Sequence, residues 1–306
     1  MMTSTRRWLI AALLLPLVAS AQTKIVLGHT GIADYVAAFV AKEQGLFAKR
    51  GLDVELLTIP SGAAASGLQS NSIQISTLPP TTLLQAVEGG LDLVALAGTS
   101  TIPRSGPNPA LVVKKGSAAK AAADLAGKKI GIPSLGGTLH VMARKWARDQ
   151  GADDRKISFV EANFPAMADL IKGGTLDGAV LADPFLGRAL AADVAQVLAP
   201  LAAGMPENTS GIFYGARRDW IAANTTAAKA FRDAITEGAE VATRNPDAAR
   251  EAIAKYTRLP PPVVAALPLP PLKPDIGDDQ LQFWIDTMRA QDLLKINPKA
   301  ASLVWR

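Results

Sequence analysis

The sequence predicts an α/β protein of two lobes, each a mostly parallel sheet with helices on both faces. Three observations lead to this prediction. The 306 residues correspond to about two domains at the usual ~150 residues each. Short β-rich runs alternate with runs of helical spacing, and this alternation is typical of parallel sheets. A stretch with three prolines, between residues 99 and 109, divides the alternation into two series.

The first series opens with the strand-like run Lys24–His29. Apolar residues between Tyr35 and Val40 then recur at helical spacing, and Gly45 supplies a left-handed stop. The same pattern of strand, loop and helix continues to the proline-containing break. The further predicted elements are a strand over 53–59, a helix over 63–69, a strand over 73–77, a helix over 81–88 and a strand over 91–97.

The second series repeats the alternation after the break. Its predicted strands are 111–113, 129–132, 157–160 and 178–181, and its predicted helices are 118–125, 138–149, 165–171 and 185–191. Residues 211–215 are predicted as a strand that returns to the first lobe, and helices from Asn224 onward should pack on that lobe. The stretch Leu259–Pro274 has seven prolines, so we expect an ordered loop with a short helix inside.

The first 21 residues have the order of a secretory signal peptide. Arg6 and Arg7 precede about a dozen apolar residues, and Ala19-Ser20-Ala21 has the A-x-A form that signal peptidases accept. The apolar stretch is shorter than the ~20 residues of a membrane-spanning helix. We expect cleavage after Ala21 by the general secretory route, with release into the periplasm, or outside the cell where there is no outer membrane. The alternative is a buried N-terminal helix.

Composition excludes several classes of protein. The chain has no cysteine, which excludes disulfides, thiolate metal sites and thiol nucleophiles. Its formal charge of +5 falls to about +3 without Arg6 and Arg7, so we expect no nucleic-acid partner. The two histidines and the carboxylates lack the spacing of a metal site. Because G-x-S-x-G and G-x-G-x-x-G motifs are also missing, we expect no cofactor and no enzymatic activity.

Small polar residues gather in the loops that follow the predicted strands. In parallel α/β sheets, ligands bind beyond the carboxyl ends of the strands, where loop amides and helix N-termini point outward. Such loops suit a sulfonate, a carboxylate or another compact acceptor. Each Ser, Thr or Gly also has a simpler interpretation as a helix cap, and Asp183 is either a cap or a ligand contact. His29 and His140 are ordinary loop and helix residues, or they face one another across a cleft.

Three segments resemble one family in the same order and spacing. They are AKEQGLF with RGLDVEL over 41–56, DLAGKKIGIP over 124–133 and GGTLDGAVLADPF over 173–185. These segments resemble periplasmic solute-binding proteins of the nitrate/sulfonate/taurine class of ABC importers (NitT/TauT, SsuA/THI5-like). The similarity runs from about residue 24 to residue 215. It implies a type II periplasmic binding protein, in which two α/β lobes joined by two hinge crossovers close over one small molecule.

The resemblance also implies a domain organisation and a set of ligand-binding residues. Residues 1–21 are the signal peptide, 22–103 with 216–306 form the first lobe, and 104–215 form the second. The candidate ligand-binding residues are His29, Thr30, Tyr35, Ser61, Gly62, Thr77, Thr81, Gly136, Gly137, Thr138, His140, Asp183 and Tyr214. Two features depart from the family pattern. Ala182 stands where many members have an aromatic residue, and the loop over 77–81 carries two prolines.

The implied function is capture of a solute without chemical turnover. The chain would be a monomeric binding component that presents its solute to an ABC permease. We expect a small organic anion or an amino-sulfonate-like solute, whose amine would pair with Asp183, and an aromatic acid or nucleobase-like heterocycle is the alternative. Arg104 or His140 would balance an anion. Two other interpretations stay open: a cofactor-biosynthesis enzyme of pyrimidine-precursor or menaquinone type, and a secreted sensor of the same solute.

Overall fold

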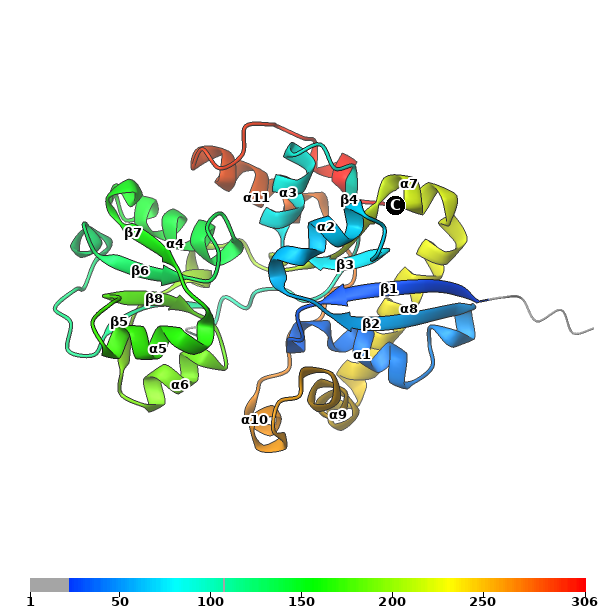
Figure 1. Cartoon of the computed structure of the whole chain (residues 1–306), viewed down its shortest axis with the longest axis horizontal. Helices are drawn as coiled ribbons and strands as arrows, with labels where there is room; N and C mark the ends of the chain where they lie inside the picture. The colour runs from blue at the N-terminus through cyan, green and yellow to red at the C-terminus, as the bar shows by residue number, and fades with distance from the viewer. Residues whose placement is uncertain (1–21, 107) are drawn as a thin grey trace, which may run out of the picture.

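The structure is a computed structural model that describes residues 22–106 and 108–306, folded as two lobes (Figure 1). The predicted signal peptide lies outside the described residues. Each lobe contains one five-stranded sheet, as the prediction of two α/β lobes requires. Among the described residues, no helix combines the length and the apolar character needed to cross a membrane.

The first sheet has the strand order β2-β1-β3-β10-β4. β1 pairs in parallel with β2 and β3, whereas β10 is antiparallel to both β3 and β4. Four of the five strands therefore share one direction, which confirms the predicted mostly parallel sheet. The strands are β1 (Thr23–His29), β2 (Leu52–Thr58), β3 (Ile75–Leu78), β4 (Leu93–Gly98) and β10 (Phe213–Arg217).

The second sheet repeats this plan with the order β7-β6-β8-β5-β9. β6 pairs in parallel with β7 and β8, and β5 is the single strand of opposite direction, between β8 and β9. The strands are β5 (Ala110–Lys114), β6 (Lys129–Ile132), β7 (Ser158–Glu161), β8 (Gly178–Leu181) and β9 (Ala195–Pro200). The helices of this lobe are α4 (Thr138–Asp149), α5 (Phe164–Lys172) and α6 (Phe185–Ala191).

Helices cover both faces of the first sheet because successive strand residues point to opposite sides. Ile25 and Leu27 of β1 lie in a buried cluster with residues of α1 and α8, and Leu78 of β3 lies in another with Leu83 of α3 and Trp284 of α11. The helices of this lobe are α1 (Val36–Glu43), α2 (Ala64–Gln69), α3 (Pro80–Glu88), α7 (Arg218–Ala223), α8 (Thr225–Arg244), α9 (Pro246–Thr257), α10 (Pro261–Ala266) and α11 (Asp278–Ala290).

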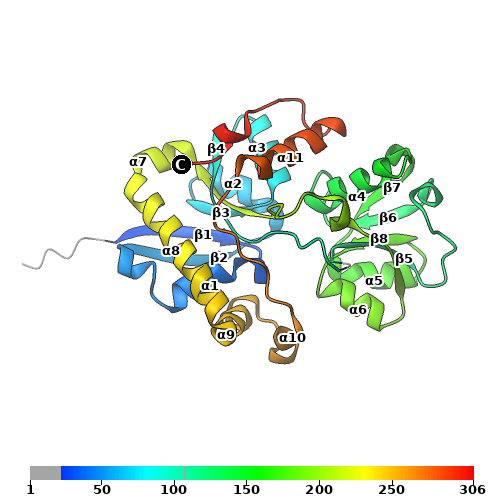
Figure 2. The same cartoon turned by 180° about the vertical axis from the view of Figure 1, so that it is seen from behind.

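Two segments cross between the lobes and lie against each other as extended chain, as Figure 2 shows from behind. The first crossover follows β4 and the second precedes β10, and they are bridged in antiparallel fashion at Thr101 and Ser210. The proline-rich segment adds a third extended chain, because Leu272 pairs with Ser100. Gly98 is required there, since a Cβ at this position would lie 2.2 Å from the carbonyl oxygen of Lys273.

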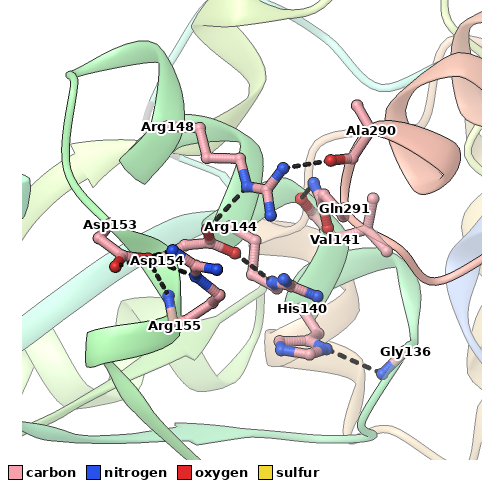
Figure 3. A network of polar contacts seen from close by, with 10 residues as sticks. All are labelled: Gly136, His140, Val141, Arg144, Arg148, Asp153, Asp154, Arg155, Ala290 and Gln291. Atoms are coloured by element: carbon pink, nitrogen blue, oxygen red, sulfur yellow. Dashed lines mark hydrogen bonds and ion pairs between the residues drawn. The ribbon is translucent and has the colours of Figure 1, made fainter.

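The C-terminal part of the chain also connects the lobes, through α11 and α4 (Figure 3). Gln291 Nε2 donates to the main-chain oxygen of Val141 at 2.8 Å, and Arg148 donates to the main-chain oxygen of Ala290. The same arginine and Arg144 both donate to Asp154, whose side chain is 3% exposed. We call this contact the α4–α11 clasp, after its members Val141, Arg148, Ala290 and Gln291.

Several element predictions need correction. The helix predicted over 118–125 is only the 3-10 helix η4 (Ala122–Leu125), because Asp124 accepts hydrogen bonds from the amides of Lys120 and Ala121 and thereby fixes the helix start at Ala122. The edge strand β9 was not predicted. β10 includes residues 213–215, which the predicted boundary had placed in the second lobe, although they pair in the first sheet. The short helix in the proline-rich stretch is confirmed as α10.

Candidate functional site

The carboxyl ends of the parallel strands in each sheet point toward the other lobe (Figure 1). The loops that follow these strands, together with the helix N-termini they lead into, therefore lie between the lobes. Two contacts join them. Thr81 Oγ1 is 3.4 Å from Thr138 Oγ1, and Gln85 Nε2 donates to the oxygen of Gly136 at 3.4 Å. Thr81, Gly136 and Thr138 are thus brought together, as the sequence predicted for three of its candidate residues.

Local sequence explains how these two helix starts approach so closely. Pro80 occupies the first turn of α3, where its missing N–H costs no hydrogen bond. Gly137 precedes α4 in an extended conformation, and Gly136 has a φ of +72°. A Cβ on Gly136 would lie 2.4 Å from Gln85 Nε2. The glycine pair therefore lets the second lobe bring the main chain at the α4 N-terminus against α3 of the first lobe.

His29 is the last residue of β1 and is buried in the first lobe, with 1% of its surface exposed. Its Nδ1 accepts a hydrogen bond from the amide of Gly31 at 3.0 Å, so the neutral ring carries its proton on Nε2. Burial lowers the pKa of His29 to about 4. The ring packs edge-on against Phe39 at a centroid distance of 5.2 Å. His29 therefore stays uncharged at neutral pH and holds the loop after β1.

His140 has the same arrangement in the second lobe. Its Nδ1 accepts from the amide of Gly136 at 2.8 Å, and its ring packs edge-on against Phe159. Burial, assisted by the positive charge of Arg144, lowers the pKa of His140 to about 4. Each histidine thus supports a loop of its own lobe through Nδ1, which agrees with the interpretation of His29 and His140 as ordinary loop and helix residues.

A buried polar row crosses the first sheet at its carboxyl edge. Thr77 of β3 is the register partner of Tyr214 on β10, and Thr30 bonds the hydroxyl of Tyr35 at 2.9 Å. Burial raises the pKa of Tyr35 to about 12 and also raises the pKa of Tyr214. Among the described residues, His29 Nε2 has no hydrogen-bond partner, whereas Thr77 hydrogen-bonds Tyr35 and the main chain of Ala38 hydrogen-bonds Tyr214. This row therefore holds one polar atom that the protein itself does not satisfy.

Asp34 belongs to the same loop and was missed by the sequence analysis. It lies in the 3-10 helix η1 (Ala33–Tyr35) and accepts a hydrogen bond from the hydroxyl of Ser100, at the start of the first crossover. Burial raises the pKa of this carboxyl, although the Ser100 hydrogen bond opposes the shift. The signal available in the sequence was its position five residues after the strand end at His29, inside the predicted ligand loop.

The remaining candidates lie at other points of the same edges. Asp183 Oδ1 accepts from the amide of Gly187 at 3.1 Å, so the carboxylate caps α6. Ser61 and Gly62 lie in the 3-10 helix η3 (Ser61–Ala63), directly before α2. The described hydrogen bonds do not link Asp183 to the other candidates. The ligand-binding role of Ser61, Gly62 and Asp183 stays a prediction.

Arg104, named as a possible anion partner, lies elsewhere. It donates to the carbonyl oxygen of Ala203 at 3.3 Å and pairs with Glu207 at 3.8 Å. An open groove of about 630 Å³ lies there, between α4, α11 and residues 203–206, and its lining includes Arg104, Lys145 and Arg148. None of the thirteen candidate residues lines this groove. The groove is therefore distinct from the loops between the sheets.

Comparison with known proteins agrees with this arrangement. The sequence model of a family described as "NMT1/THI5 like" matches residues 32–249. The chain is 27% identical over 243 residues to the nitrate/nitrite binding protein NrtA of Nostoc sp., covering 70% of this chain and 53% of NrtA. It is 30% identical over 166 residues to a putative thiamine biosynthesis protein of Haemophilus influenzae, covering 53% of this chain and 50% of that one. The chain thus spans about half the length of these relatives.

A solved structure supports the fold. The periplasmic aliphatic sulphonate binding protein SsuA of Escherichia coli superposes with a TM-score of 0.75 at 20% sequence identity. The superposition covers 92% of this chain and 97% of SsuA. At this identity the likeness establishes the two-lobed architecture rather than the ligand.

Proposed function

Because the chain belongs to the NMT1/THI5-like family, we propose that it is the extracytoplasmic solute-binding component of an ABC importer. One small solute binds between the lobes and leaves chemically unchanged. The proposal rests on two observations. The carboxyl ends of the parallel strands in each sheet face the other lobe, and Thr81 of α3 contacts Thr138 of α4. The relative named a nitrate/nitrite binding protein supports the same class of function.

In this mechanism, closure of the two lobes is the change that the permease detects. A solute that contacts loops of both lobes binds the closed form more tightly than the open form, and it shifts the population toward closure by that difference in affinity. A membrane permease then recognises the closed form. The antiparallel crossovers at Thr101 and Ser210 are short extended chains, which suit bending between two rigid lobes.

We place the protein in the periplasm. The order of charged, apolar and small residues over 1–21 supports export, and the structural neighbour SsuA is itself named periplasmic. Mass spectrometry of the chain purified from the periplasmic fraction tests this. Retention of residues 1–21 on the exported protein, or its absence from that fraction, contradicts the placement.

The similarity to a putative thiamine biosynthesis protein gives an enzyme as the second candidate. The two histidines favour the binding function. Each one accepts a loop amide on Nδ1 and has its pKa lowered to about 4, so neither is poised to exchange protons at neutral pH. Both act as positioning residues for the loops that would surround a solute.

Native mass spectrometry of freshly purified protein, followed by small-angle scattering, tests the proposed function. We expect a retained small molecule, a monomeric mass, and a smaller radius of gyration with the solute than after its removal by unfolding and refolding. The solute should be recovered with unchanged mass after incubation. A radius that is the same with and without the solute, or a chemically altered solute, overturns the proposal.

A further inference from the structure

The loops between the sheets carry an unusual balance of charge. We call residues 29–35, 58–64, 77–82, 132–140, 160–165 and 182–187 the facing loops, because they follow six strands whose carboxyl ends point at the other lobe and lead back into the same lobe. The segments after β4 and β9 are the crossovers and are not included. At the chain's frequency of 32 Lys and Arg in 306 residues, these 41 residues would hold about four cationic side chains. They hold none, whereas Asp34, Glu161 and Asp183 are acidic.

The three carboxylates are held in place by neutral partners. Asp34 accepts from the Ser100 hydroxyl, Glu161 accepts from the amide of Leu135 at 2.6 Å, and Asp183 accepts from the amide of Gly187. No ion pair of the described residues includes any of the three. The negative charges of Glu161 and Asp183 are therefore not neutralised by a neighbouring Lys or Arg, and they repel a bare oxyanion placed between the lobes. Burial raises the pKa of Asp34, so this carboxyl contributes less negative charge.

Apolar side chains are exposed at the same edges. The described residues include five large apolar side chains with high exposure, and four of them lie on or beside the facing loops: Ile32 at 40%, Leu57 at 38%, Leu135 at 54% and Val160 at 38%. Ile32 comes from the loop after β1 and Leu135 from the loop after β6, so both lobes contribute. Such surface is suited to an apolar molecule, since ligand sites are mostly apolar with a few placed polar groups.

A buried polar atom without a partner completes this edge. His29 Nε2 is an N–H donor at the end of β1, and among the described residues it has no hydrogen-bond partner. It can donate to an acceptor atom at the polar end of the solute. Because such a donor bonds neutral and anionic acceptors alike, the charge preference rests on the carboxylates of the facing loops.

We propose that the solute has an apolar body and a neutral or cationic polar end, rather than being a free oxyanion. This inference rests on the proposed function and specifies its ligand. It differs from the organic anion expected from the family resemblance, and it agrees with the expectation that Asp183 meets an amine. Its charge preference follows from the facing loops alone, since these carry three carboxylates and no Lys or Arg.

Arg188 offers the strongest alternative, because it is the first cation after the facing loops. Its guanidinium lies over the ring of Phe185, 5.8 Å from the ring centroid. If it anchored an anionic solute, Arg188→Gln would abolish that binding. We expect this variant to bind the neutral and cationic probes as the parent protein does.

Three probes of nearly identical shape test the charge preference: benzamidine, benzamide and benzoate, which carry +1, 0 and −1. Nitrate and methanesulfonate serve as small oxyanions. Isothermal titration of the solute-free protein should show binding of benzamidine or benzamide at least tenfold tighter than of benzoate, and no binding of the two small anions.

Variants with a neutral side chain of the same shape then show which carboxylates cause the charge preference. Asp183→Asn and Glu161→Gln each remove a charge while keeping an oxygen that accepts the same amide. Each should weaken benzamidine binding by about two- to fivefold, as expected for partly exposed charges, and leave benzamide unchanged. Asp177→Asn is the matched control, because its carboxylate lies at the opposite end of β6, on the amide of Lys129.

The outcomes separate the two proposals. Tighter binding of benzoate, nitrate or methanesulfonate overturns the charge inference and leaves the importer function standing. Equal binding of all three benzene derivatives overturns the inference as well. No binding of any probe, together with no retained solute by native mass spectrometry, overturns both the inference and the proposed function.

Discussion

Gln291 donates a hydrogen bond from Nε2 to the main-chain oxygen of Val141, and these two atoms are 2.8 Å apart. Gln291 follows the C-terminal helix α11 of the first lobe, whereas Val141 is in α4 of the second, so this bond joins the lobes away from the crossovers. Only 2% of Gln291 is exposed. The α4–α11 clasp is therefore a second connection between lobes that are expected to move.

Gln291→Ala should lower the free energy of unfolding by about 1–2 kcal/mol, because it removes a buried hydrogen bond between the lobes. Urea denaturation followed by tryptophan fluorescence measures this. Gln282→Ala is the control, since the Gln282 side chain bonds Asp286 on the same helix. Equal stability of the two variants would show that the clasp does not hold the lobes.

Asp154→Asn should be more destabilising, by about 2–4 kcal/mol, because it leaves two guanidinium groups around a neutral, buried side chain. Burial opposes ionisation of Asp154, but the hydrogen bonds from Arg144 and Arg148 outweigh it and lower the pKa of the carboxyl. Asp153→Asn, in the neighbouring exposed pair with Arg155, should change stability little. Guanidinium denaturation compares the two, and a similar loss in both contradicts the role of burial.

Stability should fall between pH 6.5 and pH 4 because of the histidines. The pKa of His29 and of His140 is about 4 in the folded protein, against 6.5 for the free side chain. The unfolded chain therefore binds protons that the folded chain does not, and stability is fully present above pH 6.5 and lost as the pH falls toward 4. Each histidine should contribute about 2–3 kcal/mol to this loss.

His140→Asn tests this pH dependence, because asparagine keeps an acceptor for the Gly136 amide without titrating. The difference in unfolding free energy between pH 7 and pH 4.5 should be smaller in this variant than in the parent protein. An unchanged difference would mean that His140 becomes protonated at its ordinary pKa within the folded state.

Gly98→Ala should destabilise the place where the first crossover packs against the proline-rich segment. The added Cβ would lie 2.2 Å from the carbonyl oxygen of Lys273, so the proline-rich chain must move, at a cost of about 1–3 kcal/mol. Thermal melting measures the change. Gly62→Ala adds a Cβ with no atom within 4 Å, so it should melt close to the parent temperature. A normal melting temperature for Gly98→Ala would show that the chain there is loosely packed.

Much of the fold was predictable because local patterns and tertiary packing agree. The strand at Lys24–His29 has alternating apolar residues that the structure buries against α1 and α8, and the proline-rich stretch contains a short helix as expected. The helix predicted over 118–125 failed because the Asp124 side chain bonds two main-chain amides, a local contact that apolar spacing does not reveal.

The sequence predicted which loops follow the strands, but it did not predict how the side chains of these loops are arranged. The rule that ligands bind beyond strand ends brought Thr81 and Thr138 together correctly. It could not show that His29 and His140 each accept a main-chain amide of their own loop, because side-chain direction depends on the packing of Phe39 and Phe159. Asp34 was overlooked because a single acidic residue in a loop has no distinctive pattern.

One buried apolar cluster includes Leu83 from the first lobe, Val141 and Met142 from the second, and Trp284 of α11 between them. Unfolding of one lobe would therefore expose apolar side chains of the other lobe. Heating should therefore melt both halves in a single calorimetric peak, with equal calorimetric and van't Hoff enthalpies. The molecule would thus behave as one thermodynamic unit, although its two sheets look like separate domains.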